Sequence, residues 1–298
     1  MDNGQRGVRL VTSFVATAVV VALVWVVLTT AWMWRYQERV VFQPPAAYPD
    51  APAPARRVEF KASDGHALFG YLVSPPRAGP ADAGTPRGPR AVVIVFHGNA
   101  DLAAWQIPWA QELAERSGAT VFVAEYRGYA GIPGTPTYQA AAADARGALD
   151  FMRTEFPSSD VILYGHSLGT AIATELAAHM RPRPPKALVL LSPFTSARDM
   201  AARMLVAPIP WIWQRISRVH YDTRNLVAQL ECPVFVAHGN RDLNIPVRMG
   251  REVFGAARTP GGLLIVEGAG HNDVPDVGGE RYWRWLVAAV GSGAAVAK

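Results

Sequence analysis

VILYGHSLGTAIATELAAHM (residues 161–180) joins two different hydrophobic patterns through a short glycine-rich turn. The run VILYG is typical of a buried strand, and the run after Ser167 has the spacing of a helix. A Gly-x-Ser-x-Gly sequence at such a junction, here with Gly165, His166 and Gly169 around the serine, lets a strand turn abruptly into a helix. The crowded turn requires glycines and holds the serine strained, with its Oγ exposed. We therefore interpret Ser167 as a nucleophile rather than as an N-cap serine in an ordinary loop.

Short apolar runs alternate with helical patterns on both sides of this stretch, which predicts a mostly parallel sheet covered by helices. The first two strand candidates are joined through Asp64 and Gly65 and are expected to form a hairpin. Strands are expected at residues 58–61, 68–73, 91–96, 120–125, 161–165, 187–192, 233–239 and 263–268. Helices are expected at residues 102–116, 138–156, 168–180, 247–257 and 280–290.

One interval departs from this alternation of strands and helices. Between two strand candidates, residues 195–230 form a connection longer than usual and contain the apolar sequence VAPIPWIWQRI. We interpret it as a helix and a short apolar lid, over about residues 197–228.

A serine hydroxyl is a poor nucleophile at neutral pH and needs a base to take its proton. Two histidines follow the expected lid. His238 ends a strand candidate, where it would help to shape the next loop. His271 lies in the glycine-rich sequence GAGHND after the last strand candidate, which can bring an imidazole over the carboxyl edge of the sheet. We therefore predict that His271 is the base.

The base needs a carboxylate to orient it and to stabilise the imidazolium that forms. Asp242, in HGNRDLNIP, follows a strand candidate and should reach the same edge of the sheet as His271. The alternatives are Asp222 in the lid, and Asp273 and Asp276 beside His271. Because Asp273 is too near His271 in sequence to face it easily, we favour Asp242.

The negative charge that develops on an attacked carbonyl oxygen needs fixed hydrogen-bond donors. One expected donor is the backbone N–H of Leu168, the residue after the nucleophile. The second is expected from HGNAD, after the strand at 91–96, where we choose the backbone N–H of Asn99. Alternatively, His97 and Gly98 only make a turn. The tyrosines and Arg127 of EYRGYAGIPGTP (125–136) are expected to buttress this loop.

The N-terminal region predicts a membrane anchor. Residues 10–34 contain no charged side chain, which is enough helix to cross a bilayer of about 30 Å. A cleaved signal peptide is the alternative, but its apolar core would be only about 7 to 15 residues long. Trp32, Trp34 and Tyr36 resemble the aromatic belt of a membrane interface. We therefore expect a single-pass anchor over residues 1–36.

The orientation of this anchor is weakly determined by charge. Arg6 and Arg9 precede the apolar run, and Arg35 and Arg39 follow it. Since these numbers balance, the usual behaviour of N-terminal anchors favours an N-terminus inside and a catalytic domain on the exported side.

The Pro/Ala-rich sequence PPAAYPDAPAP belongs to an expected linker, residues 37–56, and the folded domain is expected at 57–298. A second low-complexity stretch, residues 75–90, is expected to be a loop. The formal net charge of +5 lacks the long Lys/Arg runs of a nucleic-acid patch, so the membrane is the expected electrostatic partner. Cys232 is the only cysteine, which excludes an intrachain disulfide.

FHGNA, YRGY, YGHSLG, HGNRDLNIP and GAGHND occur in an order and spacing that resemble the single-pass, membrane-anchored α/β-hydrolase-domain family. The resemblance extends from about residue 58 to the C-terminus. It implies an α/β-hydrolase fold: a mostly parallel eight-stranded sheet flanked by helices, with a short lid and an N-terminal transmembrane helix. It also implies a nucleophile, acid, base and two oxyanion donors at Ser167, Asp242, His271, Asn99 and Leu168.

These features predict a serine hydrolase that cleaves ester or thioester bonds. The apolar lid near residues 209–213 and the nearby bilayer favour an acyl or lipidic substrate. A peptidase or amidase of the same fold is one alternative, and a catalytically silent, membrane-tethered binding module is another. Because the sequence contains neither metal-ligand spacing nor a dinucleotide fingerprint, we expect no metal and no cofactor.

Overall fold

The computed structural model describes residues 2–49, 52, 55–75, 89–205 and 209–292. Its centre is an eight-stranded sheet, which confirms the expected number of strands and their mostly parallel arrangement. The strands are β1 (Arg56–Lys61), β2 (Ala67–Val73), β3 (Ala91–Phe96), β4 (Thr120–Ala124), β5 (Asp160–His166), β6 (Ala187–Leu191), β7 (Val234–Gly239) and β8 (Pro260–Val266).

The sheet has the order β1-β2-β4-β3-β5-β6-β7-β8. β1 and β2 form the expected antiparallel hairpin, and β2 is antiparallel to β4. The remaining pairs are parallel, so the carboxyl ends of β3 to β8 meet at one edge. Strands covered on both faces are almost entirely apolar, as in β3, β6 and β4, in which only Thr120 at the start is polar.

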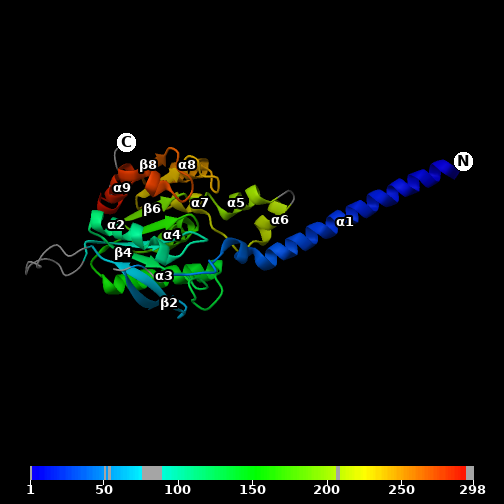
Figure 1. Cartoon of the computed structure of the whole chain (residues 1–298). Helices are drawn as coiled ribbons and strands as arrows, with labels where there is room; N and C mark the ends of the chain where they lie inside the picture. Colours follow the sequence, from blue (N-terminus) through cyan, green and yellow to red (C-terminus); the bar gives the residue numbers. More distant parts are fainter. Residues whose placement is uncertain (1, 50–51, 53–54, 76–88, 206–208, 293–298) are drawn as a thin grey trace, which may run out of the picture.

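Helices cover both faces of the sheet (Figure 1). The 3₁₀ turn η1 (Ala103–Gln106) leads into α2, which packs against α9; α3 packs on α4, α4 on α7, and α7 on α8. These helices are α2 (Ile107–Ser117), α3 (Tyr138–Glu155), α4 (Leu168–His179), α7 (Thr223–Val227), α8 (Val247–Ala256) and α9 (Val274–Ser292).

Two of the expected helices differ in detail. The segment expected as one helix at 102–116 begins as η1, and Pro108 lies in the first turn of α2, where its missing N–H costs nothing. The last helix begins at Val274 rather than at residue 280, with a break at Gly279, whose φ is 47°. A left-handed conformation of this kind favours glycine.

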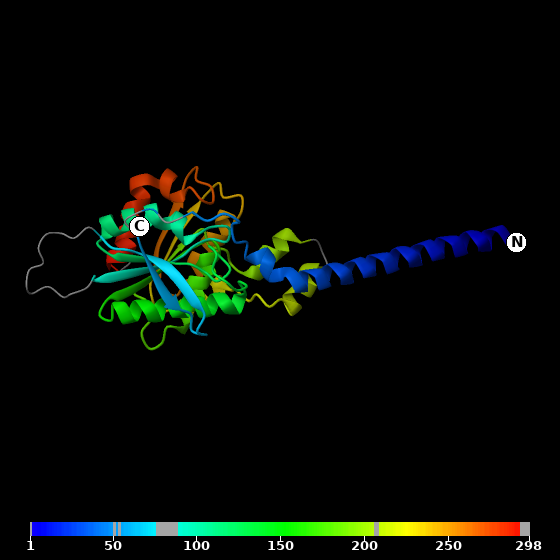
Figure 2. The ribbon, with the colours of Figure 1, turned by 60° about the horizontal axis from the view of Figure 1, so that its bottom comes forward.

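The interval expected as a helix and an apolar lid, 197–228, contains α5 (Ala197–Met204), α6 (Ile209–Ile216) and α7. α6 contains the PWIW sequence, and its Ile209 and Trp213 are buried. Residues 206–208, within this interval, lie outside the described residues. α5 and α6 lie beside the domain end of the N-terminal helix, as both views show (Figures 1 and 2).

The N-terminal helix, α1 (Asp2–Val41), runs past the expected end of the anchor at residue 36. The expected linker, 37–56, is therefore wrong in its first part. The physical reason is that this part of the chain packs on the folded domain. Gln37, in α1, is 1% exposed, and Phe42, the first residue after α1, is 2% exposed. The rest of α1 projects away from the domain (Figure 2).

Besides the lid, parts of four predictions fall outside the described residues. They are residue 1 of the expected anchor, residues 50–51 and 53–54 of the Pro/Ala-rich linker, most of the loop expected at 75–90, and the C-terminal residues 293–298 of the folded domain.

Candidate active site

Ser167 lies between β5 and α4 with φ 53° and ψ −116°, a strained conformation for a residue with a side chain. The adjacent glycines allow the turn to form. A Cβ at Gly165 would collide with the backbone of Gly169, and a Cβ at Gly169 would collide with the carbonyl of Phe96. The strand, turn and helix expected from GHSLG are therefore present.

The three residues predicted as nucleophile, base and acid form one hydrogen-bonded chain. His271 Nε2 is 2.9 Å from Ser167 Oγ, and His271 Nδ1 is 2.6 Å from Asp242 Oδ2. All three follow strands at the carboxyl edge of the sheet: Ser167 follows β5, Asp242 follows β7, and His271 follows β8. This edge is the usual ligand side of an open α/β sheet.

Asp242 is held as a carboxylate. Burial alone would raise its pKa, but hydrogen bonds from His238, His271 and the Ile245 N–H outweigh burial and hold the pKa well below its ordinary value. Asp242 Oδ1 accepts from the Asn244 and Ile245 N–H groups at 2.9 and 2.8 Å, which leaves Oδ2 for His271.

His238 shapes the loop after β7, as expected. Its Nε2 is 2.8 Å from the Ile245 carbonyl oxygen and 3.2 Å from Asp242 Oδ2. We did not predict the contact with Asp242 from the sequence. The signal that could have found it is a histidine at the end of an apolar strand, four residues before an aspartate. His238 therefore helps to orient the carboxylate that faces His271.

The alternative carboxylates have other partners. Asp222 caps α7 by accepting from the Asn225 N–H, and Asp273 accepts from the Gly270 N–H. Asp276 lies in the first turn of α9. Of the four candidate aspartates, Asp242 is therefore the one whose carboxylate lies within hydrogen-bonding distance of His271.

His166, inside the Gly-x-Ser-x-Gly turn, packs near the base. Its ring lies 5.3 Å from the His271 ring, and its Nε2 is 3.3 Å from the His271 carbonyl oxygen. Burial and the neighbouring His271 lower the pKa of His166 to about 4. A neutral His166 adds no positive charge that would oppose an imidazolium on His271.

The loop after β3 lies beside the nucleophile. A Cβ at Gly98 would be 3.5 Å from Ser167 Cβ, so the backbone of this loop closely approaches the serine. Asn99 Oδ1 accepts from the Gln43 N–H at 2.6 Å and from the Tyr129 hydroxyl at 3.4 Å. The Asn99 side chain is thereby turned toward the end of α1, while the role of its backbone N–H, and that of Leu168, stays a prediction.

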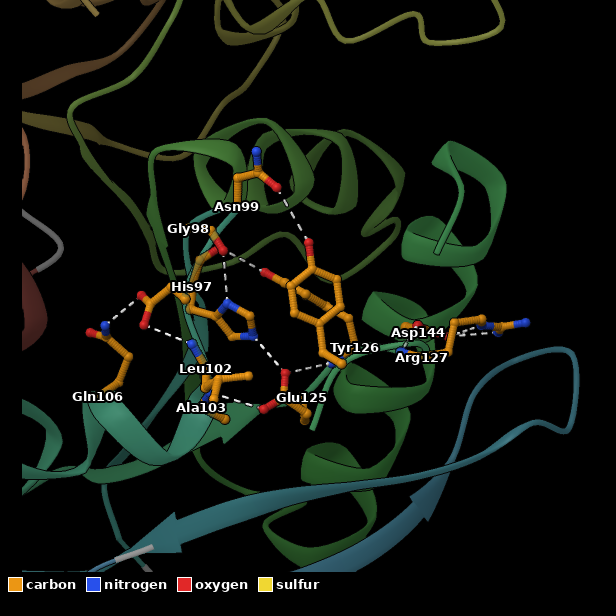
Figure 3. Close-up of polar contacts among 12 residues, drawn as sticks. His97, Gly98, Asn99, Leu102, Ala103, Gln106, Glu125, Tyr126, Arg127 and Asp144 are labelled. Atoms are coloured by element: carbon orange, nitrogen blue, oxygen red, sulfur yellow. Dashed lines mark hydrogen bonds and ion pairs between the residues drawn. The ribbon is translucent and has the colours of Figure 1, made fainter. Parts of the chain in front are cut away.

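Glu125 organises this loop from below (Figure 3). Its carboxylate is 2.8 Å from His97 Nε2 and accepts from the Ala103 and Tyr126 N–H groups. Both His97 and Glu125 are fully buried. Burial would lower the pKa of His97, but the Glu125 carboxylate outweighs burial and raises it. His97 therefore does more than form a turn with Gly98.

The expectation for EYRGY is partly wrong. The tyrosines do support the loop, since the Tyr126 hydroxyl donates to the His97 carbonyl oxygen at 3.0 Å and Tyr129 reaches Asn99. Arg127 instead pairs with Asp64 and with Asp144, and its side chain points away from His97 (Figure 3). We did not predict the role of Glu125; the signal that could have found it is an acidic residue at the end of an apolar strand.

Replacing His97 by glutamine should destabilise the protein by about 1–3 kcal/mol at pH 6, because buried Glu125 loses a charged partner. The folded pKa of His97 is above its ordinary 6.5. The stabilisation is therefore fully present below pH 6.5 and is lost as pH rises through the folded pKa. We expect the difference from wild type, measured by thermal unfolding of the detergent-solubilised chain, to shrink toward alkaline pH. His179→Gln, at an exposed histidine on α4, is the control and should stay within about 0.5 kcal/mol of wild type at pH 6.

One cavity of about 1170 Å³ is lined by Ser167, His271 and Asn99. Within the part of the chain that the structure describes, no group of three His, Cys, Asp or Glu side chains could hold a metal ion. Cys232 is buried, and burial raises the pKa of its thiol to about 11. The cavity therefore contains the Ser167 hydroxyl and the His271 imidazole, while the Asp242 carboxylate contacts that imidazole from behind.

The sheet order, the turn at Ser167 and the positions of Asp242 and His271 define the α/β-hydrolase class. Solved structures agree on the fold: a Pyrococcus furiosus esterase has a TM-score of 0.65 at 17% identity, over 84% of this chain and 98% of its own.

Sequence comparisons identify the family. A family model described as "Serine aminopeptidase, S33" matches residues 87–223. An uncharacterized protein of Mycobacterium tuberculosis is 33% identical over 81% of this chain and 82% of its own. The lysophosphatidylserine lipase ABHD12 of Mus musculus is 28% identical over 56% of this chain and 45% of its own. The chain belongs to the α/β-hydrolase family and is a hydrolase.

Proposed function

We propose that the protein is a membrane-anchored serine hydrolase that cleaves ester or thioester bonds of an acyl or lipidic substrate. The observation that carries the proposal is the hydrogen-bonded chain from Ser167 Oγ through His271 to Asp242. The esterases among structures of the same fold, and a relative named as a lipase, support the choice of bond and substrate.

In the proposed reaction, His271 Nε2 takes the proton of Ser167 as its Oγ attacks the carbonyl carbon. Asp242 accepts from Nδ1–H and stabilises the imidazolium. The proton then passes from Nε2 to the leaving alcohol or thiol, and an acyl-enzyme remains. A water molecule gives its proton to the same nitrogen, its oxygen attacks the acyl carbon, and the acid is released with Ser167 restored.

The backbone N–H groups of Leu168 and Asn99 are proposed to bind the oxyanion of the tetrahedral intermediate. Two features support this role: Leu168 begins α4 directly after the nucleophile, and the loop of Asn99 approaches Ser167 at Gly98. Loss of one such donor typically costs about a hundred- to a thousandfold in rate.

A fluorophosphonate probe tests the proposal, because it reacts covalently with activated serines. The full-length protein should be labelled, and Ser167→Ala should not be. Folded wild-type protein that resists labelling would instead support the silent binding module. A panel of p-nitrophenyl esters and thioesters beside aminoacyl p-nitroanilides separates an esterase from the peptidase alternative, which the family model's description favours.

Asp242→Asn should lower kcat for a p-nitrophenyl ester by about 10⁴-fold, since an asparagine amide can favour the wrong tautomer of His271. Asp273→Asn provides a matched control, because Asp273 is exposed and its side chain accepts from the nearby Gly270 N–H. It should stay within about tenfold of wild type. Similar rates for Asp242→Asn and wild type would rule out Asp242 as the acid.

The anchor is proposed to be α1, whose residues Arg9–Val41 form a helix long and apolar enough to span a membrane. We propose that the catalytic domain lies on the exported side, as is usual for N-terminal anchors. In a Cys232→Ser background, Val277→Cys puts one exposed thiol on α9. A membrane-impermeant maleimide should label it in intact cells, whereas labelling only after lysis would reverse the orientation.

A further inference from the structure

The end of α1 forms one wall of the cavity that contains Ser167. Beyond the hydrogen-bonded chain, the cavity extends along an apolar surface that α1, α5 and α6 build together. Representative side chains are Met33, Val40, Met200, Leu205 and Trp213. The helix that we propose as the membrane anchor is therefore also part of the substrate-binding region.

Specific contacts fix this wall to the domain. Gln37 Oε1 accepts from the Arg218 N–H at 2.7 Å, and Arg218 Nη2 donates to the Trp34 carbonyl oxygen at 3.1 Å. Phe42 is buried in the main core, and the Gln43 N–H bonds Asn99 beside the nucleophile. The position of α1 in a bilayer consequently sets the position of the cavity.

The contact between α1 and the lid lies at the level of a membrane surface. Met33 belongs to the charge-free run 10–34, and it packs with Ile209 and Trp213 of α6 in a cluster separate from the main core. At a rise of about 1.5 Å per residue, that run spans a hydrocarbon layer of about 30 Å and ends near Met33. The neighbouring Trp32 and Trp34 are exposed, as side chains of an interfacial belt are.

The lid helices also carry exposed side chains that suit a bilayer interface. Met204 of α5 and Trp211 of α6 are 68% and 69% exposed. Arg203 and Arg215 are exposed on the same two helices. An apolar group with adjacent basic residues is the pattern by which interfacial helices bind membranes that contain anionic lipid.

We propose that α5, α6 and the end of α1 form a bilayer-contacting surface, and that a long acyl chain passes laterally from the membrane into the cavity between them. This inference rests on the proposed function and adds the source and route of the substrate: an ester with a long acyl chain that resides in the same bilayer. Such a chain moves from hydrocarbon to an apolar wall without crossing water, which explains why the anchor lines the cavity.

The experiment uses the full-length protein in vesicles of phosphatidylcholine with a minor fraction of phosphatidylglycerol. Two probes share one leaving group and one ester bond: 4-methylumbelliferyl butyrate, which is short, and 4-methylumbelliferyl palmitate, which is long. Trp211→Asp places a charge on the proposed surface. Val277→Asp is the matched control, since Val277 is an apolar residue that is 48% exposed on α9, outside the lid helices α5 and α6.

We expect the ratio of palmitate to butyrate turnover to fall by about tenfold or more in Trp211→Asp and to stay near the wild-type value in Val277→Asp. Ala201→Trp, which fills the apolar wall beside the Met33 cluster, should shift the preferred chain toward shorter esters. Wild-type protein should also cleave palmitate ester in its own vesicles faster than palmitate ester added in separate vesicles.

The outcomes distinguish failure of the proposed function from failure of the proposed bilayer-contacting surface. If wild type cleaves neither ester, the proposed function is wrong. If wild type cleaves butyrate but the ratio is unchanged in Trp211→Asp, the bilayer-contacting surface is wrong, and this face serves another partner. Equal initial rates for the two vesicle arrangements would overturn lateral passage.

Discussion

Ser167→Ala is expected to lower kcat for a p-nitrophenyl ester by about a millionfold, to the residual rate that binding and oxyanion donors provide. The reason is chemical: His271 lies 2.9 Å from Ser167 Oγ, and without that oxygen no acyl-enzyme can form. The measurement is single-turnover kinetics on purified full-length protein, with loss of fluorophosphonate labelling as a second readout.

A companion variant shows whether the loss reflects chemistry or folding. Ser167→Gly also lacks the nucleophile, but glycine accepts the φ of 53° without strain. Its thermal stability should therefore exceed that of Ser167→Ala by about 1 kcal/mol, although both variants are inactive. Turnover in either variant within about tenfold of wild type would exclude Ser167 as the nucleophile.

Much of this arrangement could be predicted because short sequences determine it locally. Ser167, Asp242 and His271 each follow a strand candidate, and parallel strands bring their carboxyl ends to one edge. Chain order and glycine-rich loops then favoured one aspartate and one histidine among the alternatives. The distances that join them depend on how the loops after β5, β7 and β8 fold together, which no single stretch contains.

What could not be predicted depends on contacts between distant segments. Gln37 and Gln43 were assigned to a linker by composition, yet Arg218 and Asn99 bind them across the fold. Their contacts extend α1 and bring it to the cavity. Likewise, Arg127 and Glu125 are near neighbours in sequence, but Glu125 contacts His97 whereas Arg127 points away from it toward Asp144, which only the structure shows.

Gly169→Ala is expected to destabilise the protein by at least about 3 kcal/mol, although alanine is the better helix former. The added Cβ would meet the Phe96 carbonyl oxygen, which belongs to a central strand and cannot move aside. The turn that exposes Ser167 exists because α4 begins this close to β3. We therefore expect lower thermal stability together with reduced labelling of Ser167 by a fluorophosphonate.

Gly255→Ala provides the opposite case for comparison. Gly255 lies in α8, where an added Cβ would meet nothing within 4 Å. The same substitution should therefore stabilise the protein by about 0.5–1 kcal/mol, through reduced entropy of the unfolded chain. Thermal unfolding of both variants side by side tests the close approach itself. If Gly169→Ala matched Gly255→Ala, the turn would have room for a side chain, and the strain at Ser167 would need another cause.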